Sequence, residues 1–351
     1  MENTHIDVQN YYGEQLQSTD DLLTNACCTL TAPPKHILDA LNLVADEVQA
    51  KYYGCGLTIP SAIEGLRILD LGSGSGRDCY IASKLVGENG YVVGIDMTDA
   101  QLKVANDHIE YHTEKFGYKK ANVEFIKGNI EELGELNLEK ESFDIIISNC
   151  VINLANDKQK VLQDAFDLLK PGGEMYFSDV YSDRRIPMHL QKDKVLWGEC
   201  LSGALYWNDF LNHAKKAGFT DPRVMEDKPI TIDNKELEET VGDIKFYSVT
   251  YRLWKIDGLE SDCEDYGQAV MYKGGIPEND FALALDSGHY FQKGKIESVC
   301  GNSYNMLFET RFKTYFEFYG SFDTHFGIFA GCGGSAPFSE SGNASVEDCG
   351  C

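Results

Sequence analysis

Positive charge is scarce in this chain. It has 31 Lys and Arg residues against 56 Asp and Glu residues, and its formal net charge is −25. A surface of this sign repels phosphate backbones and anionic lipid headgroups. The composition therefore argues against nucleic acid as a substrate and against a membrane surface as a partner.

Long apolar runs are missing as well. The longest apolar stretches are far shorter than the ~20 residues that span a bilayer as a helix. The segment from Met1 to Gln17 is polar and acidic, and it lacks the basic start and apolar centre of a secretory signal. These absences predict a soluble protein of the cytoplasm.

Cysteine, in contrast, is plentiful. Eleven cysteines in a chain with no visible secretion signal should be mostly reduced, which favours metal, metalloid or redox chemistry over a structural disulfide framework. The eight histidines show no zinc-binding pattern. His108 and His112 lie four positions apart in a helical run, and we expect them on a solvated helix face.

The most informative motif is a glycine-rich turn after a short apolar run. Its glycines are Gly72, Gly74 and Gly76, and Asp70 precedes it. A dinucleotide-binding turn needs its third glycine three residues after the second, whereas Gly76 follows Gly74 by two. The spacing therefore favours S-adenosylmethionine over a nicotinamide dinucleotide.

Strand and helix patterns alternate around this motif. Strands are expected at 67–71, 91–95, 123–127, 143–148 and 174–179, and helices at 78–86, 99–116, 157–169 and 192–217. Lys170-Pro171-Gly172-Gly173 should end the third of these helices. Further strands are expected at 223–232 and 246–255. The alternation predicts a parallel, doubly wound α/β sheet that binds ligands at the carboxyl ends of its strands.

The chain resembles the class I S-adenosylmethionine-dependent methyltransferases over roughly residues 61 to 182. The resemblance lies in a tight glycine turn, an acidic residue before it, and Asp96 at the end of the next strand. A carboxylate at Asp96 can accept both ribose hydroxyls, and Asp70 can accept from the amino group of the cofactor. The expected cofactor-binding residues are Tyr53, Asp70, Gly72, Ser73, Gly74, Gly76, Asp96, Met97, Asn129, Ile130 and Asn149.

The fourth expected strand runs directly into Asn149-Cys150-Val151-Ile152-Asn153. In the class I methyltransferases the residue after this strand faces the transferred methyl group. Enzymes that methylate the amines of bases carry an Asn- or Asp-Pro-Pro-aromatic tetrad there, whereas this chain has the thiol of Cys150. The alternative is that Cys150 is a small apolar core residue, as free cysteines often are.

Two other cysteines extend this pattern. Cys55 lies in Tyr52-Tyr53-Gly54-Cys55-Gly56 and Cys200 lies in a segment between Leu196 and Tyr206. Together with the Cys150 segment and Thr24-Asn25-Ala26-Cys27, they resemble the arsenite methyltransferases over about residues 20 to 255. The resemblance implies that Cys55, Cys150 and Cys200 bind arsenic(III), and that Cys27 forms a disulfide with Cys55 during turnover.

This resemblance implies a complete reaction. Trivalent arsenic is a soft acceptor that prefers thiolates, and three thiolates leave it with a nucleophilic lone pair. The sulfonium methyl of S-adenosylmethionine is the matching electrophile. The expected substrates are arsenite and methylated trivalent arsenicals, thioredoxin or glutathione would reduce the disulfide, and the role would be arsenic detoxification.

Two other functions remain open at this point. One is a class I methyltransferase for another small acceptor, such as a sterol, a quinone or a thiol. The other is a metalloid-binding protein that keeps the cofactor fold without catalysis. Three converging thiols would argue against the first, and an intact Asp96 argues against the second.

The expected organisation has four parts. Residues 1–60 form a segment with redox and substrate cysteines, 61–255 the methyltransferase domain with its doubly wound sheet, 256–335 a small, partly β C-terminal domain, and 336–351 a cysteine-bearing tail. The tail thiols Cys332, Cys349 and Cys351 have no readable role.

Overall fold

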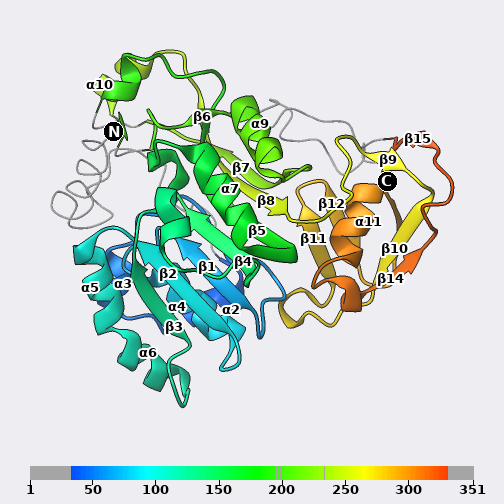
Figure 1. Cartoon of the computed structure of the whole chain (residues 1–351), viewed down its shortest axis with the longest axis horizontal. Helices are drawn as coiled ribbons and strands as arrows, with labels where there is room; N and C mark the ends of the chain where they lie inside the picture. Colours follow the sequence, from blue (N-terminus) through cyan, green and yellow to red (C-terminus); the bar gives the residue numbers. More distant parts are fainter. Residues whose placement is uncertain (1–32, 194–195, 198–199, 233, 331–351) are drawn as a thin grey trace.

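The computed structural model describes residues 33–330, except 194–195, 198–199 and 233. Cys27 and the tail cysteines, and therefore the predictions made for them, lie outside the described residues. The chain forms a large sheet flanked by helices, with a smaller strand-rich region beside it (Figure 1).

The large sheet has the order β3-β2-β1-β4-β5-β8-β7, with a short β6 paired to β5. Strands β1 to β5 are parallel, and β8 lies antiparallel between β5 and β7. The strands are β1 (Arg67–Leu71), β2 (Tyr91–Asp96), β3 (Val123–Lys127), β4 (Phe143–Asn149), β5 (Leu169–Ser182), β6 (Leu205–Tyr206), β7 (Arg223–Pro229) and β8 (Phe246–Trp254). The predicted doubly wound α/β sheet of the class I methyltransferases is confirmed.

Helices cover both faces of this sheet. They are α2 (Lys35–Leu41), α3 (Asp46–Ala50), α4 (Arg77–Val86), α5 (Asp99–Asp107), α6 (Ile109–Phe116), α7 (Lys158–Leu168), α9 (Trp207–Ala217) and α10 (Lys235–Val241), with short 3₁₀ turns η4 (Ile130–Glu135), η5 (Ile152–Leu154) and η6 (Leu190–Lys192). None of the helices in the described part of the chain has the length and apolar character needed to cross a membrane.

Alternation along β1 explains the two hydrophobic cores. Leu69 and Leu71 pack with α7 and α9 on one face, whereas Ile68 packs with α2 and α4 on the other. Side chains two positions apart in a strand share a face, so Asp70 lies on the same face as Ile68. The apolar run therefore buries both faces and leaves its only carboxylate next to the glycine turn.

Several predicted boundaries were wrong. The helix expected at 99–116 is broken at His108 into α5 and α6. His112 is buried rather than solvated, because its Nε2 accepts a hydrogen bond from the backbone N–H of Ala45 at 3.2 Å. Helix α10 was not expected, and the strand at 223–232 ends at Pro229, which has no N–H to donate.

The region around Cys200 also differs from the prediction. In place of one helix over 192–217, the helix α9 begins only at Trp207. The two residues before it pair with the end of β5 as strand β6. The predicted stop after α7 is confirmed, because α7 ends at Leu168 and Gly172 takes a left-handed backbone with φ +77°.

The C-terminal region is small and partly β, as expected. It contains β9 (Glu264–Asp265), β10 (Gln268–Tyr272), η7 (Pro277–Asn279), β11 (Ala282–Asp286), β12 (His289–Gln292), β13 (Ile296–Val299), α11 (Gly301–Phe308), η8 (Lys313–Tyr315), β14 (Phe316–Tyr319) and β15 (Gly327–Ile328). It has its own hydrophobic core and packs beside β7, where the backbone N–H of Ser287 donates to the carbonyl of Val224 at 2.8 Å (Figure 1).

Candidate active site

A pocket opens at the carboxyl ends of β1, β2 and β4. Every expected cofactor-binding residue except Gly76 lines it: Tyr53, Asp70, Gly72, Ser73, Gly74, Asp96, Met97, Asn129, Ile130 and Asn149. Its position follows from the reversal of strand order between β1 and β4, where neighbouring loops diverge and leave a crevice.

The three glycines have different roles. Gly74 has φ +53°, and no protein atom lies within 4 Å of the place where a Cβ would stand, so its front face is open to a ligand. A Cβ at Gly72 would lie 2.4 Å from Val151, and one at Gly76 would lie 2.6 Å from Phe125. Gly76 does not line the pocket, and packing against Phe125 leaves no room for a side chain there.

Asp70 is buried at the base of the pocket. The thiol of Cys79 donates to its Oδ2 at 3.1 Å. Burial, reinforced by the nearby carboxylate of Asp78, raises the pKa of Asp70 to about 8. A cationic group bound here would restore the ionised form, because an opposite charge at close range favours it.

Asp96 closes the other side of the glycine turn. Its Oδ2 accepts from the backbone N–H of Gly74 at 2.9 Å, and its Oδ1 accepts from the N–H of Thr98 at 2.7 Å. Burial raises the pKa of Asp96, and these backbone donors oppose the shift. The carboxylate is thus held in a fixed orientation at the pocket wall with lone pairs left for a ligand.

Asn149 joins the pocket to the Cys55 segment. Its Oδ1 accepts from the N–H groups of Cys55 and Gly56 at 2.9 and 3.2 Å. Its Nδ2 lies 2.7 Å from the hydroxyl of Tyr52 and 2.9 Å from the carboxylate of Asp78. Asn149 lines the pocket, but its amide group is used mainly to hold the loop that carries Cys55.

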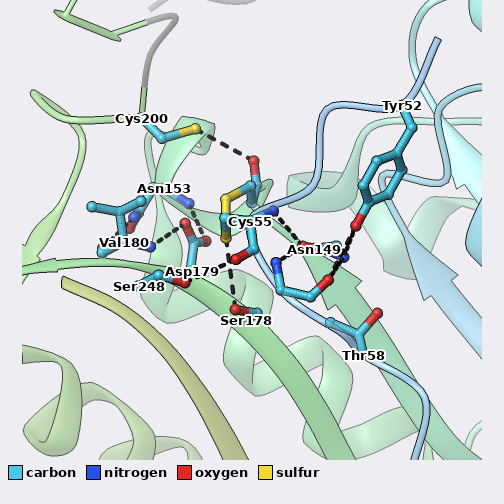
Figure 2. The surroundings of a disulfide bond; sticks show 12 residues. Tyr52, Cys55, Thr58, Asn149, Asn153, Ser178, Asp179, Val180, Cys200 and Ser248 are labelled. Atoms are coloured by element: carbon cyan, nitrogen blue, oxygen red, sulfur yellow. Dashed lines mark hydrogen bonds between the residues drawn. A yellow bond between two sulfur atoms is a disulfide. The ribbon is translucent and has the colours of Figure 1, made fainter. Parts of the chain in front are cut away.

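Cys55 and Cys150 are joined by a disulfide bond with a Cα–Cα distance of 5.7 Å. Figure 2 shows Asn149 and Tyr52 on one side of this bond and Cys200 on the other. The expectation of mostly reduced cysteines therefore fails at this pair, although Cys79, Cys200, Cys263 and Cys300 are free thiols. The resemblance had implied Cys27 as the disulfide partner of Cys55, and Cys27 lies outside the described residues.

Cys200 completes a convergence of three cysteines. Its Sγ donates to the backbone carbonyl of Cys150 at 3.5 Å (Figure 2). Cys55, Cys150 and Cys200 are buried in one cluster, although they come from separate segments of the sequence. Cys150 also lines the cofactor pocket, so the cluster and the pocket share a wall.

Two of these cysteines have an unusual backbone. Cys150 has φ +56° and Cys200 has φ +60°, a left-handed conformation that costs a residue with a side chain roughly 1–2 kcal/mol. Such residues persist only where the surroundings fix them, and they concentrate at functional sites. The backbone N–H of Cys150 donates to Ser178, and that of Cys200 donates to Trp197.

Polar side chains that were not among the predicted site residues surround the cluster. Ser178 Oγ lies 3.6 Å from Cys55 Sγ, and the hydroxyl of Ser248 donates to the carbonyl of Cys55 at 3.0 Å (Figure 2). Asp179 accepts from the N–H of Asn153, and burial raises its pKa to about 7. Ser178 and Asp179 lie on β5, Ser248 lies on β8, and Asn153 follows β4.

The three converging cysteines do not form a complete set of thiolate ligands while Cys55 and Cys150 are joined. Among the residues that the structure describes, no group of three His, Cys, Asp or Glu side chains is placed to bind a metal ion. Only Cys200 of the three converging cysteines has a free thiol here. A site with three thiolates therefore requires reduction of the bond between Cys55 and Cys150.

Comparison with known families matches both parts of the chain. A profile described as a methyltransferase domain matches residues 63–218. A second profile, described as an arsenite methyltransferase C-terminal domain, matches residues 266–332.

Individual proteins agree with these matches. The arsenite methyltransferase of Aquipseudomonas alcaligenes is 56% identical over 334 residues, covering 95% of this chain and 96% of that protein. The arsenite methyltransferase of Homo sapiens is 50% identical over 309 residues, covering 87% and 81%. The crystal structure of an arsenic(III) S-adenosylmethionine methyltransferase from Chlamydomonas reinhardtii has a TM-score of 0.82 at 52% identity, covering 85% of this chain and 100% of that one.

High identity over nearly the full length of both chains, a shared fold and a matching C-terminal region lead to one conclusion: this chain belongs to the arsenite methyltransferase family.

Proposed function

We propose that this chain methylates trivalent arsenic held by the thiolates of Cys55, Cys150 and Cys200. The convergence of these three buried cysteines carries the proposal, because one of them, Cys150, also lines the cofactor pocket. An organic acceptor would need a general base or an apolar pocket and has no use for three thiols. Residues 1–60 and 61–255 would supply this site, and 256–335 would form a separate C-terminal domain.

The residues of the pocket fit S-adenosylmethionine. Asp70 would accept from its amino group and Asp96 from its ribose hydroxyls. The open face of Gly74 allows close approach of the backbone, and Met97 and Ile130 provide apolar walls for the adenine. When bound, the cofactor supplies an electrophilic methyl group on a sulfonium.

The cysteines would prepare arsenic as the nucleophile. Arsenite exchanges its three hydroxyl groups for three thiolates, and each thiol proton leaves with a hydroxyl as water, so no external base is consumed. The arsenic lone pair then lies at the apex of a pyramid, and Cys150, which is shared with the pocket wall, directs the bound arsenic toward the cofactor. Catalysis by the protein is chiefly positioning.

A redox step has to follow. Formation of the arsenic–carbon bond uses the arsenic lone pair, so arsenic becomes formally pentavalent. Two thiolates that join as a disulfide return two electrons and restore trivalent arsenic. The family resemblance assigns this disulfide to Cys27 and Cys55, and the bond between Cys55 and Cys150 supports a role for Cys55 in disulfide formation. Thioredoxin or glutathione would regenerate the thiols, and the methylated product would serve arsenic detoxification.

The direct test uses the full chain with arsenite, S-adenosylmethionine and a thiol reductant, followed by arsenic speciation. We expect methylated arsenic and one S-adenosylhomocysteine for each methyl group transferred, with turnover that stops when the reductant is omitted. Binding of both ligands without any methylated product would indicate a metalloid-binding protein instead. Cofactor turnover with a quinone or a small thiol, and none with arsenite, would indicate a different methyltransferase.

A further inference from the structure

The C-terminal region holds the segment that follows Cys55. The hydroxyl of Ser61 donates to Oδ1 of Asn279 at 2.7 Å, and the backbone N–H of Ala62 donates to Oε1 of Glu278 at 3.0 Å. Nε of Arg311 donates to the carbonyl of Ser61 at 3.0 Å. Three side chains of the C-terminal region therefore bind two consecutive residues of the segment that follows Cys55.

This segment leads directly back to Cys55. Ser61 follows Cys55 by six positions, and the intervening residues Thr58, Ile59 and Pro60 are buried. The hydroxyl of Thr58 donates to Asp78 at 3.3 Å. A displacement of Ser61 should therefore be transmitted through these packed residues to Cys55.

The backbone of Ala62 is strained at the place where the C-terminal region binds it. Ala62 has φ +58°, a left-handed conformation that is unfavourable for alanine. Its side chain packs against the hydrophobic core of the C-terminal region. Since a strained residue persists only where its surroundings fix it, contacts from the C-terminal region hold the chain in this turn.

Arg311 links the bound segment to the large sheet. Besides Ser61, it binds the carboxylate of Glu174, which is fully buried on β5 and is also paired with Arg252 at 2.8 Å. Removal of Arg311 would leave part of this buried charge without its partner, at a cost to folding. Glu278 and Asn279 are partly exposed. Substitutions there test the hydrogen bonds to the Cys55 segment without disturbing the buried ion pairs of Glu174.

We propose that Glu278 and Asn279 are positioning residues that hold the Cys55 segment in place for arsenic binding. The inference rests on the proposed function, because it assigns a task within that site. This gives the C-terminal region a role in catalysis, although none of its residues in the described part of the chain lines the cofactor pocket. Glu278 and Asn279 act on Cys55 indirectly, because they bind Ser61 and Ala62 farther along the same segment.

The kinetic test compares the double variant Glu278→Ala/Asn279→Ala with Glu278→Gln and with Asp280→Ala. Asp280 lies next in the chain but binds Gly275 and Lys293 instead of the Cys55 segment. Loss of two hydrogen bonds should lower kcat/KM for arsenite about tenfold or more, with the KM for S-adenosylmethionine within about twofold of wild type. Glu278→Gln keeps an acceptor for Ala62 and should retain most activity, and Asp280→Ala should match wild type.

A second measurement does not depend on turnover. In the reduced protein, alkylation of Cys55 by iodoacetamide should be slow, because Cys55 is 5% exposed, and should accelerate severalfold in the double variant. Cys79, which is buried and hydrogen-bonded to Asp70, serves as an internal reference. Unchanged Cys55 alkylation and unchanged arsenite kinetics in a folded double variant would overturn the proposal. Absence of arsenite methylation in the wild type would count against the proposed function. The alkylation rates would still decide whether Glu278 and Asn279 hold the Cys55 segment in place.

Discussion

The side-chain oxygen of Asn149 lies 2.9 Å from the backbone nitrogen of Cys55, although 94 positions separate the two residues. This hydrogen bond fixes the Cys55 segment to the end of β4, one residue before Cys150. The two cysteines are therefore brought together by a side chain that belongs to the cofactor pocket.

Asn149→Ala should uncouple the cysteines from the pocket. It leaves the N–H groups of Cys55 and Gly56 without their acceptor, which costs about 1–3 kcal/mol. We expect kcat/KM for arsenite to fall about tenfold or more. Asn129→Ala is the matched control, because Asn129 lines the same pocket but caps η4. Arsenite kinetics of Asn149→Ala equal to those of the wild type would contradict this role.

Asp96→Ala should weaken cofactor binding selectively. The substitution removes the acceptor for the ribose hydroxyls together with the hydrogen bonds to Gly74 and Thr98. A charge-assisted pair is worth roughly 1.5–3 kcal/mol, so affinity for S-adenosylmethionine should fall more than tenfold. Calorimetric titration measures this affinity, and arsenite binding to the reduced protein should hardly change. Wild-type cofactor affinity in this variant would rule out the assignment.

Asp70 should make cofactor binding depend on pH. Its pKa is raised to about 8, so in the free protein the carboxyl is mostly protonated at neutral pH and must lose its proton to pair with a cationic amino group. Affinity for S-adenosylmethionine should therefore decrease as pH falls from about 7.5 to about 6, by up to about tenfold per pH unit. Asp70→Asn should lose this dependence. A parallel pH profile in the variant would show that another group is responsible.

The cysteine variants should separate arsenic ligands from redox partners. Cys150→Ser and Cys200→Ser should abolish methylation of both arsenite and the monomethylated trivalent substrate, because a methylated arsenic has only two positions left for thiolates. Cys27→Ser and Cys55→Ser should each lose the first methylation and keep the second. Assays of the four variants on both substrates decide the matter, and residual activity in Cys150→Ser would exclude the proposed arsenic site.

His112 should make the fold sensitive to acid. Burial lowers its pKa from 6.5 to about 4, and its neutral ring accepts from Ala45 and stacks on Tyr80 at 3.5 Å. The unfolded chain takes up a proton below pH 6.5 that the native protein refuses, so the free energy of unfolding falls as pH decreases toward about 4. The loss should be on the order of 1–2 kcal/mol. His112→Gln keeps an acceptor but cannot titrate, so denaturant unfolding at several pH values should show a flatter profile, and parallel profiles would contradict the role.

Local chemistry made much of the fold and of the cofactor pocket readable from the sequence. The glycine turn, the placement of Asp96 and the stop at Gly172 depend on neighbouring residues and on backbone angles that few residue types adopt. Strand and helix periods likewise reflect which faces are buried, and the parallel order followed from their alternation. For these features no distant partner had to be known.

Contacts between distant segments could not be read in this way. Three such contacts join residues far apart in the chain. They are the hydrogen bond from Cys55 to Asn149, the disulfide between Cys55 and Cys150, and the hydrogen bond from Ala62 to Glu278. The burial of His112 is of the same kind, since its ring accepts from the N–H of Ala45, 67 positions away.

The three cysteines illustrate the difference. Their type, and the position of Cys150 directly after a strand, pointed to thiolate chemistry, because reactivity belongs to the side chain. Their convergence depends on left-handed backbones at Cys150 and Cys200 and on the buried surroundings that pay for that strain. Burial and distant hydrogen bonds arise only when the whole chain packs, which is why folding alone could assemble the site.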